Sequence, residues 1–158
     1  MKPFVDVAEL YVDDRGSVYC AMDNMSRMGA TGRTPIKRTY VVHNWEKGRI
    51  RAWHGHAEGW TGLHVIGGAA KIVAIPMNQQ CTAAHCDSPN RVVCKVLSDK
   101  APGILWVPPG WFNGHMSLED NTKILVYSTH TFEEVKADDI RQRLTDADIG
   151  LYFKVRNR

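Results

Sequence analysis

Two histidines separated by a single residue carry the strongest chemical signal in this chain. His54 and His56 end a strand-like run that begins at Gly48, and Arg51 lies within the same run. Because side chains alternate between the two faces of a strand, both imidazoles are expected to point the same way. Imidazole titrates near neutral pH and is also a common metal ligand. The pattern therefore predicts a lined pocket used for proton transfer or for metal binding.

Composition limits the class of protein that can hold this pocket. The chain has 158 residues, 44% of them hydrophobic and 23% charged, which suits a single domain over residues 1–158. Its net charge is only +3 and no block of lysine and arginine stands out, so nucleic acid is not expected as a partner. No apolar run approaches the ~20 residues of a membrane-spanning helix. The segment Met1–Asp6 lacks the apolar centre of a signal peptide, and we expect a cytoplasmic protein.

Short runs rich in β-branched and aromatic residues, separated by Gly, Pro, Asn and Asp, dominate the chain. They predict an all-β sandwich or barrel. Helical spacing is confined to Glu133–Leu144, near the C-terminus, and residues 76–91 are expected to form a long polar loop. The predicted strands are Tyr40–His43, Arg49–His54, Leu63–Ile66, Lys71–Ile75, Val92–Leu97, Ile104–Val107 and Thr122–Ser128.

Two segments, residues 48–56 and residues 103–115, resemble the paired motifs of the cupin superfamily. The resemblance implies a double-stranded β-helix, the cupin jelly roll, with a small molecule bound at its mouth. Metal-binding cupins carry a glutamate a few residues beyond the paired histidines and another histidine in the second motif. Here Glu58 follows His56 too closely, and Asn113 stands where the further histidine would be. We therefore expect acid–base groups without a metal or other cofactor, with a metal-dependent cupin as an alternative.

A longer ordered series of segments resembles the dTDP-4-dehydrorhamnose 3,5-epimerase family. The series spans about residues 11–151 and matches patterns such as D-x-R-G, K-G-V-L-R-G-L-H and L-W-I-P-x-G-F. Its order makes it more specific than any single motif. The matching segments are Asp14–Gly16, Lys47–His54, Leu105–Trp111, Ile124–Tyr127 and Thr145–Leu151.

The related dTDP-sugar 3,4-ketoisomerases are also similar. Ile36–Tyr40 matches their I-K-R-x-Y strand, Arg51–His56 matches R-G-x-H-A-H, and Ser128–Arg141 echoes S-x-x-Y-x-E-x-D-Y-I-R. The chain thus combines features of both families. Both resemblances imply an isomerase that acts on a dTDP-linked 4-keto-6-deoxyhexose in deoxysugar biosynthesis.

Both reactions begin with the loss of a hydrogen next to a carbonyl group. An epimerase then needs an acid on the opposite face of the sugar, whereas a ketoisomerase moves hydrogen between C3 and C4 on one face. The epimerase resemblance implies that His54 is the base and Tyr127 the acid, although a tyrosine on an apolar strand is more often a core residue. His56 instead suits the ketoisomerase. We expect epimerisation at C3, C5 or both, with the ketoisomerase as the nearest alternative.

Further residues are predicted to hold the nucleotide sugar. The resemblance assigns Arg15 and Arg51 to the diphosphate, a role that a planar, permanently charged guanidinium suits. Trp111 and Phe132 are candidates for stacking on the base or sugar, and Asn44 either binds substrate or holds a turn. Strict alternation puts Arg51 on the face opposite the first histidine of the pair, so a β-bulge between them is needed. The family also implies a homodimer.

Two functional residues of the epimerase family have no direct match in this chain. The lysine that stabilises the enolate aligns near Thr61, and Lys71 or His64 could take its place. The aspartate that orients the histidine base falls beyond Arg158. Without these groups His54 would be a less firmly oriented base. A non-catalytic nucleotide-sugar binder is therefore a further alternative.

Overall fold

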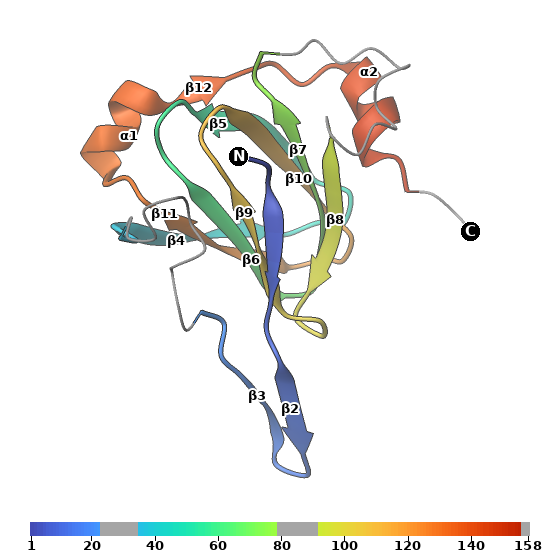
Figure 1. Ribbon diagram of the computed structural model, residues 1–158. Helices are drawn as coiled ribbons and strands as arrows, with labels where there is room; N and C mark the ends of the chain where they lie inside the picture. Colours follow the sequence, from blue (N-terminus) through green and yellow to red (C-terminus); the bar gives the residue numbers. More distant parts are fainter. Residues whose placement is uncertain (23–34, 79–91, 156–158) are drawn as a thin grey trace.

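The computed structural model describes residues 1–22, 35–78 and 92–155, which form two five-stranded antiparallel sheets packed face to face (Figure 1). This is the predicted all-β jelly roll. The first sheet contains, in spatial order, β1 (Phe4–Val7), β9 (Gly103–Val107), β6 (Thr61–Gly67), β11 (Thr122–Ser128) and β4 (Arg38–Asn44). The second contains β12 (Ile140–Arg141), β5 (Ile50–His56), β10 (Trp111–Ser117), β7 (Ala69–Pro76) and β8 (Val93–Ser98).

The core forms because apolar side chains recur at every second position of the strands. Alternate residues of a strand share a face, so each strand contributes a pair of side chains to the space between the sheets. Each fully buried aliphatic side chain contributes about 1.5–3 kcal/mol. The central cluster includes Leu63 and Val65 of β6, Ile72 and Ala74 of β7, Leu105 and Val107 of β9, and Ile124 and Val126 of β11.

The strands predicted from the β-rich runs are all present, with ends shifted by at most two residues. Strand β10 is not among the predicted strands, because Asn113 and Gly114 interrupt its apolar run. It nevertheless pairs with both β5 and β7. The helix predicted over Glu133–Leu144 is too long. Helix α1 covers Phe132–Asp138 only, because the residues that follow pair with β5 as strand β12. Of the predicted loop, residues 79–91 lie outside the described part of the chain.

Helix α1 begins in a capping box that fixes its direction. The Thr131 hydroxyl accepts a hydrogen bond from the Glu134 backbone N–H at 3.3 Å, and the Glu134 carboxylate accepts one from the Thr131 N–H at 2.8 Å. The helix therefore starts directly after β11 and ends beside the last residues of β5. Consecutive acidic residues, Asp138 and Asp139, are delivered there.

The C-terminal residues cover the outer face of the second sheet. Helix α2 (Asp146–Asp148) continues into a π-helical turn, Ile149–Phe153. The rings of Tyr152 and Phe153 pack on Trp53 with centroid separations of 5.3 and 5.5 Å. None of the helices within residues 1–22, 35–78 and 92–155 has the length and apolar content needed to cross a bilayer.

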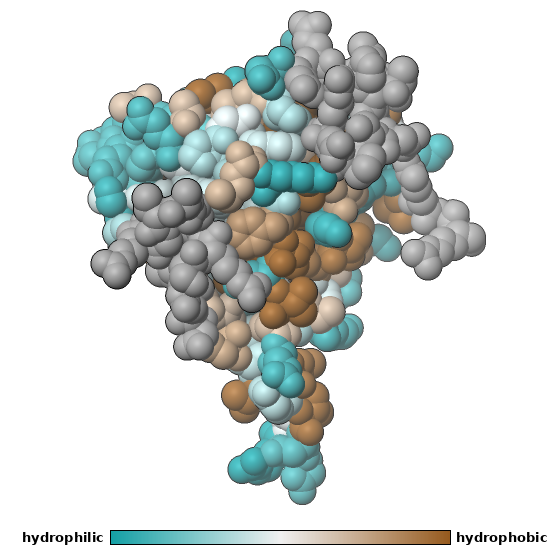
Figure 2. Space-filling view, in the orientation of Figure 1, coloured by the Kyte–Doolittle hydropathy of each residue, from teal (hydrophilic) through white to brown (hydrophobic). Residues whose placement is uncertain are grey.

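A two-stranded hairpin projects away from the sandwich (Figure 1). It consists of β2 (Leu10–Asp13) and β3 (Gly16–Tyr19). Hydrophobic side chains occupy its stem and hydrophilic ones its tip (Figure 2). Tyr11, Val12 and Val18 are all exposed on the stem. An isolated two-stranded hairpin is only marginally stable in water, so these side chains form an apolar surface without a cover in the described part of the chain.

Candidate active site

A hollow of about 380 Å³ opens between the two sheets at the end of strand β5. This volume lies within the usual range for small-molecule sites. Strands β4, β6 and β11 of the first sheet form one wall, and strands β5 and β10 of the second sheet form the other. The polar lining consists of Tyr40, Arg51, His54, His56, Thr61, Asn113, His115, Arg141 and Gln142, and the apolar lining includes Val42, Leu63 and Val126.

His54 lies in this hollow beside a carboxylate. Its Nε2 contacts an oxygen of Asp139, whose other oxygen accepts a hydrogen bond from Arg141 Nε at 2.9 Å. Burial lowers the pKa of His54, and this effect outweighs the opposing influence of the Asp139 charge. The imidazole is therefore neutral at neutral pH. A proton on Nε2, shared with Asp139, leaves Nδ1 as the nitrogen that can accept a proton. Asp139 thus supplies the carboxylate partner for His54 that the resemblance to the epimerase family did not identify.

His56 lines the same hollow, as the alternation of β5 predicts. The centroids of the two imidazole rings lie 5.6 Å apart. His56 is buried, and its Nδ1 donates a hydrogen bond to the backbone carbonyl of Asp138 at 2.8 Å. A carbonyl oxygen can only accept, so this bond places a proton on Nδ1. Both histidines are therefore oriented by consecutive residues at the end of α1.

The Asp138 carboxylate joins α1 to the turn after β5. It accepts hydrogen bonds from the backbone N–H groups of Ala57, Glu58 and Gly59 at 2.7, 3.1 and 3.1 Å. Burial alone would raise the pKa of Asp138, but these three N–H groups outweigh it and hold the pKa below its ordinary value. The ionised carboxylate therefore links the end of α1 to the turn after β5 and fixes where α1 ends. We call this set of hydrogen bonds the Asp138 clasp. It keeps the next residue, Asp139, against His54.

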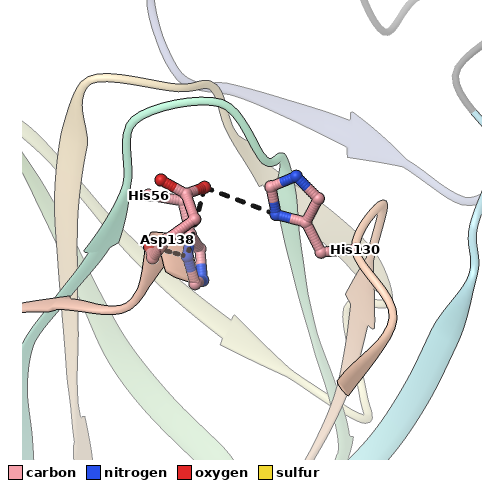
Figure 3. Close-up of side chains that lie close together, drawn as sticks. All are labelled: His56, His130 and Asp138. Carbon is pink, nitrogen blue, oxygen red and sulfur yellow. Dashed lines mark hydrogen bonds and ion pairs between the residues drawn. The ribbon is translucent and has the colours of Figure 1, made fainter. Parts of the chain in front are cut away.

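His56, His130 and Asp138 lie close enough to raise the question of a metal site (Figure 3). His130 Nδ1 lies 3.4 Å and His56 Nδ1 3.7 Å from the same carboxylate oxygen. That carboxylate already accepts three backbone N–H groups, and His56 Nδ1 already donates to a carbonyl. A metal would have to displace these hydrogen bonds, so the donor set does not fit a cation.

Arg51 reaches the hollow through an irregularity in β5. Along β10, His115 pairs with Arg51 and Asn113 with His54, so three steps on β5 oppose two on β10. This is the bulge that the sequence requires, and it turns Arg51 to the same side as His54. Gly114 lies opposite the bulge, where a Cβ would come within 2.4 Å of Ala52 Cβ. Only glycine fits this position without a shift of the strands.

Asn44 and His115 surround the Arg51 guanidinium. Asn44 is 1% exposed, and its Oδ1 accepts a hydrogen bond from Arg51 Nε at 2.9 Å. His115 is also buried, and burial, reinforced by the Arg51 charge, lowers its pKa to about 4. Its imidazole is therefore neutral at neutral pH. Within the described part of the chain, no carboxylate pairs with Arg51, which leaves a positive charge available to an anionic ligand.

Tyr127 does not lie in the hollow with His54. On β11 the preceding residue, Val126, lines the hollow, so Tyr127 faces the outer side of the first sheet. It packs there with Trp60 and Trp106, and its hydroxyl lies 3.4 Å from His64 Nδ1. The structure therefore separates Tyr127 from His54 and does not support its assignment as the acid.

Tyr40 is the tyrosine that lines the hollow, although only the I-K-R-x-Y match drew attention to its strand. It lies on β4 of the first sheet, whereas His54 lies on β5 of the second, so the hollow separates the two. Burial raises the pKa of Tyr40, although the nearby Arg38 charge opposes the rise. The phenol is therefore protonated at neutral pH and can donate a proton.

The other predicted binding residues lie outside the lining of the hollow. Arg15 is at the tip of the β2–β3 hairpin, where its side chain is 86% exposed and bonded to Asp13. Trp111 is partly buried and donates its indole N–H to the Met1 carbonyl at 3.0 Å. Phe132 is exposed at the start of α1, beneath the Arg38 guanidinium. Neither suggested substitute for the missing lysine is in the hollow: Lys71 Nζ bonds the Lys154 carbonyl, and His64 lies beside Tyr127.

Comparison with known proteins identifies the fold and leaves the reaction open. Neither a protein-family model nor a curated protein matches the chain. Solved structures do. A 3'-monoepimerase from Streptomyces bikiniensis, solved in complex with dTDP-quinovose, has a TM-score of 0.75 at 15% identity, covering 94% of this chain and 73% of its own.

Two further structures come from the two families that the sequence resembles. The dTDP-4-dehydrorhamnose 3,5-epimerase of Sulfolobus tokodaii has a TM-score of 0.69 at 20% identity, covering 88% of this chain and 76% of its own. A 3,4-ketoisomerase from Helicobacter canadensis has a TM-score of 0.65 at 19% identity, covering 90% and 92%. The chain thus has the jelly-roll fold that dTDP-sugar epimerases and 3,4-ketoisomerases share.

Proposed function

We propose that this protein is an isomerase that removes a proton next to the ketone of a nucleotide-linked 4-keto-6-deoxyhexose. One observation carries the proposal: a neutral histidine, His54, paired with Asp139, lies in a hollow that also contains the Arg51 guanidinium, which no carboxylate of the described residues pairs with. A neutral imidazole is a suitable base for a carbon acid, and a guanidinium suits a diphosphate. Solved relatives of the same fold were crystallised with dTDP-quinovose or with TDP, which supports a substrate of this class.

Epimerisation at C3, C5 or both is the reaction we assign first. His54 Nδ1 takes the proton from carbon, and the electron pair moves onto the ketone oxygen to give an enolate. Tyr40, from the opposite sheet, then returns a proton to the other face of that carbon, which inverts the centre and restores the ketone. Tyr40 thus takes the role that the sequence assigns to Tyr127. The reaction is redox-neutral and requires no cofactor.

A 3,4-ketoisomerase is the second candidate, and the placement of the two histidines favours it. His54 and His56 project from the same strand with ring centroids 5.6 Å apart, and one ring nitrogen of each is bonded to a residue at the end of α1. Such a pair suits a hydrogen shift between neighbouring carbons on one face of the sugar. The position of the ketone in the product separates the two reactions.

We also propose that the single domain acts as a homodimer in the cytoplasm. The exposed apolar stem of the β2–β3 hairpin supports association with a second copy. The β2–β3 hairpin projects from the sandwich (Figure 1), and Arg15, between its two strands, does not line the hollow of its own chain. If Arg15 binds a diphosphate, it does so at the hollow of a partner.

Proton NMR of dTDP-4-keto-6-deoxyglucose incubated with the protein in D2O tests the function. Loss of the H3 signal, with or without H5, and appearance of an epimer would establish epimerisation. A ketone at C3 would identify the ketoisomerase. His54→Asn should lower the exchange rate by about 10²–10⁴-fold. If every sugar signal persists although the nucleotide sugar is bound, the protein is a non-catalytic binder.

A further inference from the structure

A second hollow adjoins the active-site hollow at Arg51. It is a groove at the corner where β4 leads into β5, lined by residues 43–46 and 49–51. Arg51 lines both hollows, so a ligand that fills the first and contacts this guanidinium reaches the edge of the second. We call the second hollow the corner groove.

Two of the residues that line the corner groove, Asn44 and Arg51, have polar groups that can accept a further partner. Asn44 is 1% exposed, its Oδ1 is bonded to Arg51 Nε, and its Nδ2 has no hydrogen-bond partner among the described residues. A buried amide N–H without an acceptor is unfavourable, and a ligand oxygen would satisfy it. The Arg51 guanidinium has no carboxylate partner in residues 1–22, 35–78 and 92–155. Together they suit the oxygens of a phosphate group.

An exposed indole stands beside these groups. Trp45 is 75% exposed, whereas Trp53, Trp60 and Trp106 are at most 8% exposed. The corner that carries it is held in place, because the Trp45 carbonyl accepts a hydrogen bond from the Asn121 N–H at 3.0 Å. The His43 ring approaches its edge with a centroid separation of 6.5 Å. The groove therefore combines an exposed aromatic ring with the Arg51 cation and the Asn44 amide.

We infer that the corner groove binds the nucleoside end of the substrate, with the diphosphate against the Arg51 guanidinium and Asn44 Nδ2 and the base stacked on Trp45. This rests on the proposed function, because it divides one nucleotide sugar between two hollows: the sugar at His54 and the base at Trp45. Stacking on an aromatic side chain accepts any base, since every base has a π-face. Trp45 therefore sets affinity for a nucleotide over a bare phosphate.

Isothermal titration with dTDP and with pyrophosphate tests this division. Trp45→Ala should weaken dTDP binding by roughly tenfold or more, and pyrophosphate binding should not change. Trp45→Phe should restore most of the affinity, since it keeps an aromatic face. Val96→Ala, which removes an exposed apolar side chain from β8, is the control and should bind dTDP as the wild type does. Bound dTDP should also protect Trp45 from fluorescence quenching by acrylamide.

The possible failures are distinguishable. Unchanged dTDP affinity in Trp45→Ala, or an equal loss for dTDP and pyrophosphate, overturns the assignment of the base to Trp45. In either case sugar-proton exchange by the wild type would leave the proposed function standing. A wild-type protein that neither binds dTDP nor exchanges sugar protons would contradict the proposed function itself.

Discussion

At the scale of single residues, the proposed chemistry depends on how consecutive acidic residues divide their roles. Asp139 contacts the His54 imidazole, whereas the Asp138 backbone carbonyl bonds His56 and its carboxylate bonds the turn after β5. Each histidine is held in a defined tautomer by a group from the end of α1. A displacement of that end would disturb both bases together.

The pH dependence of proton exchange should report on the His54–Asp139 pair. Only the neutral imidazole acts as a base, and burial lowers the His54 pKa, so the exchange rate should rise with pH and level off from a midpoint below about 6.5. Asp139→Asn removes a charge that raises this pKa. The midpoint should therefore move to lower pH, and the plateau rate should fall by roughly 100-fold. NMR exchange assays from pH 4.5 to 8 measure both.

Asp146→Asn, at an exposed carboxylate on α2, is the control for this pH profile and should leave it unchanged. A midpoint that moves upward in Asp139→Asn would contradict the assignment of Asp139 to His54.

Removal of one hydroxyl group separates the roles of the two tyrosines. Tyr40→Phe should form the epimer roughly 100-fold more slowly, while deuterium still enters on the original face, because His54 remains able to remove and return a proton. Tyr127→Phe should keep its turnover, since that hydroxyl lies on the outer side of the first sheet beside His64. NMR of the product and of the residual substrate measures both quantities. Loss of turnover in Tyr127→Phe alone would restore the original assignment.

At the scale of elements, the sequence predicts the framework better than the contacts across it. The alternation that predicts β5 also predicts that His54 and His56 share a face, because both effects are local. The partner of His54 is not local: Asp139 lies 85 residues away, in a segment that reads as the middle of a helix. Tyr127 and Val126 are equally plausible inward residues until the register of β11 is known.

Two features of β10 explain why its placement could not be predicted. Its Asn113 and Gly114 weaken the strand pattern, yet the absence of a Cβ at Gly114 is what lets the bulged segment of β5 lie against it. Local propensity and tertiary packing therefore favour different structures here, and packing prevails. The bulge itself was a requirement of the chemistry, since Arg51 must share a side with His54.

The Asp138 clasp should dominate the acid stability of the α1–β5 contact. Its pKa is lower folded than unfolded, so it stabilises the fold above its ordinary pKa of 3.8, and this contribution is lost as the pH falls through the folded value. Asp138→Asn keeps the shape but loses the charge that three N–H groups bind. We expect a loss of about 1–3 kcal/mol at pH 7.

Urea unfolding of the wild type and of Asp138→Asn at pH 7 and near pH 3 measures this contribution. The difference between the two proteins should narrow at the lower pH. A difference that stays constant over this range would show that the charge of Asp138 does not contribute.

At the scale of the whole molecule, the structure of a single chain does not explain why the β2–β3 hairpin has an exposed apolar stem. Its apolar stem is exposed, and Arg15 at its tip does not line the hollow that contains His54 and His56. In a dimer with twofold symmetry, each hairpin would meet the same surface of the other copy. The proposed dimer would thereby cover the stem and give Arg15 an anionic ligand.

Mixed dimers test whether Arg15 serves the partner's hollow. Arg15→Ala and His54→Asn should each be nearly inactive alone. If the two variants are unfolded together and refolded, half of the dimers are mixed, and one site in each mixed dimer has both an intact His54 and an Arg15 from the other copy. About a quarter of the sites should then recover activity. Sedimentation analysis should show a dimer throughout. If the mixture has no more activity than its components, either Arg15 does not reach the partner's hollow or the variants do not exchange, and labelled subunits distinguish these outcomes.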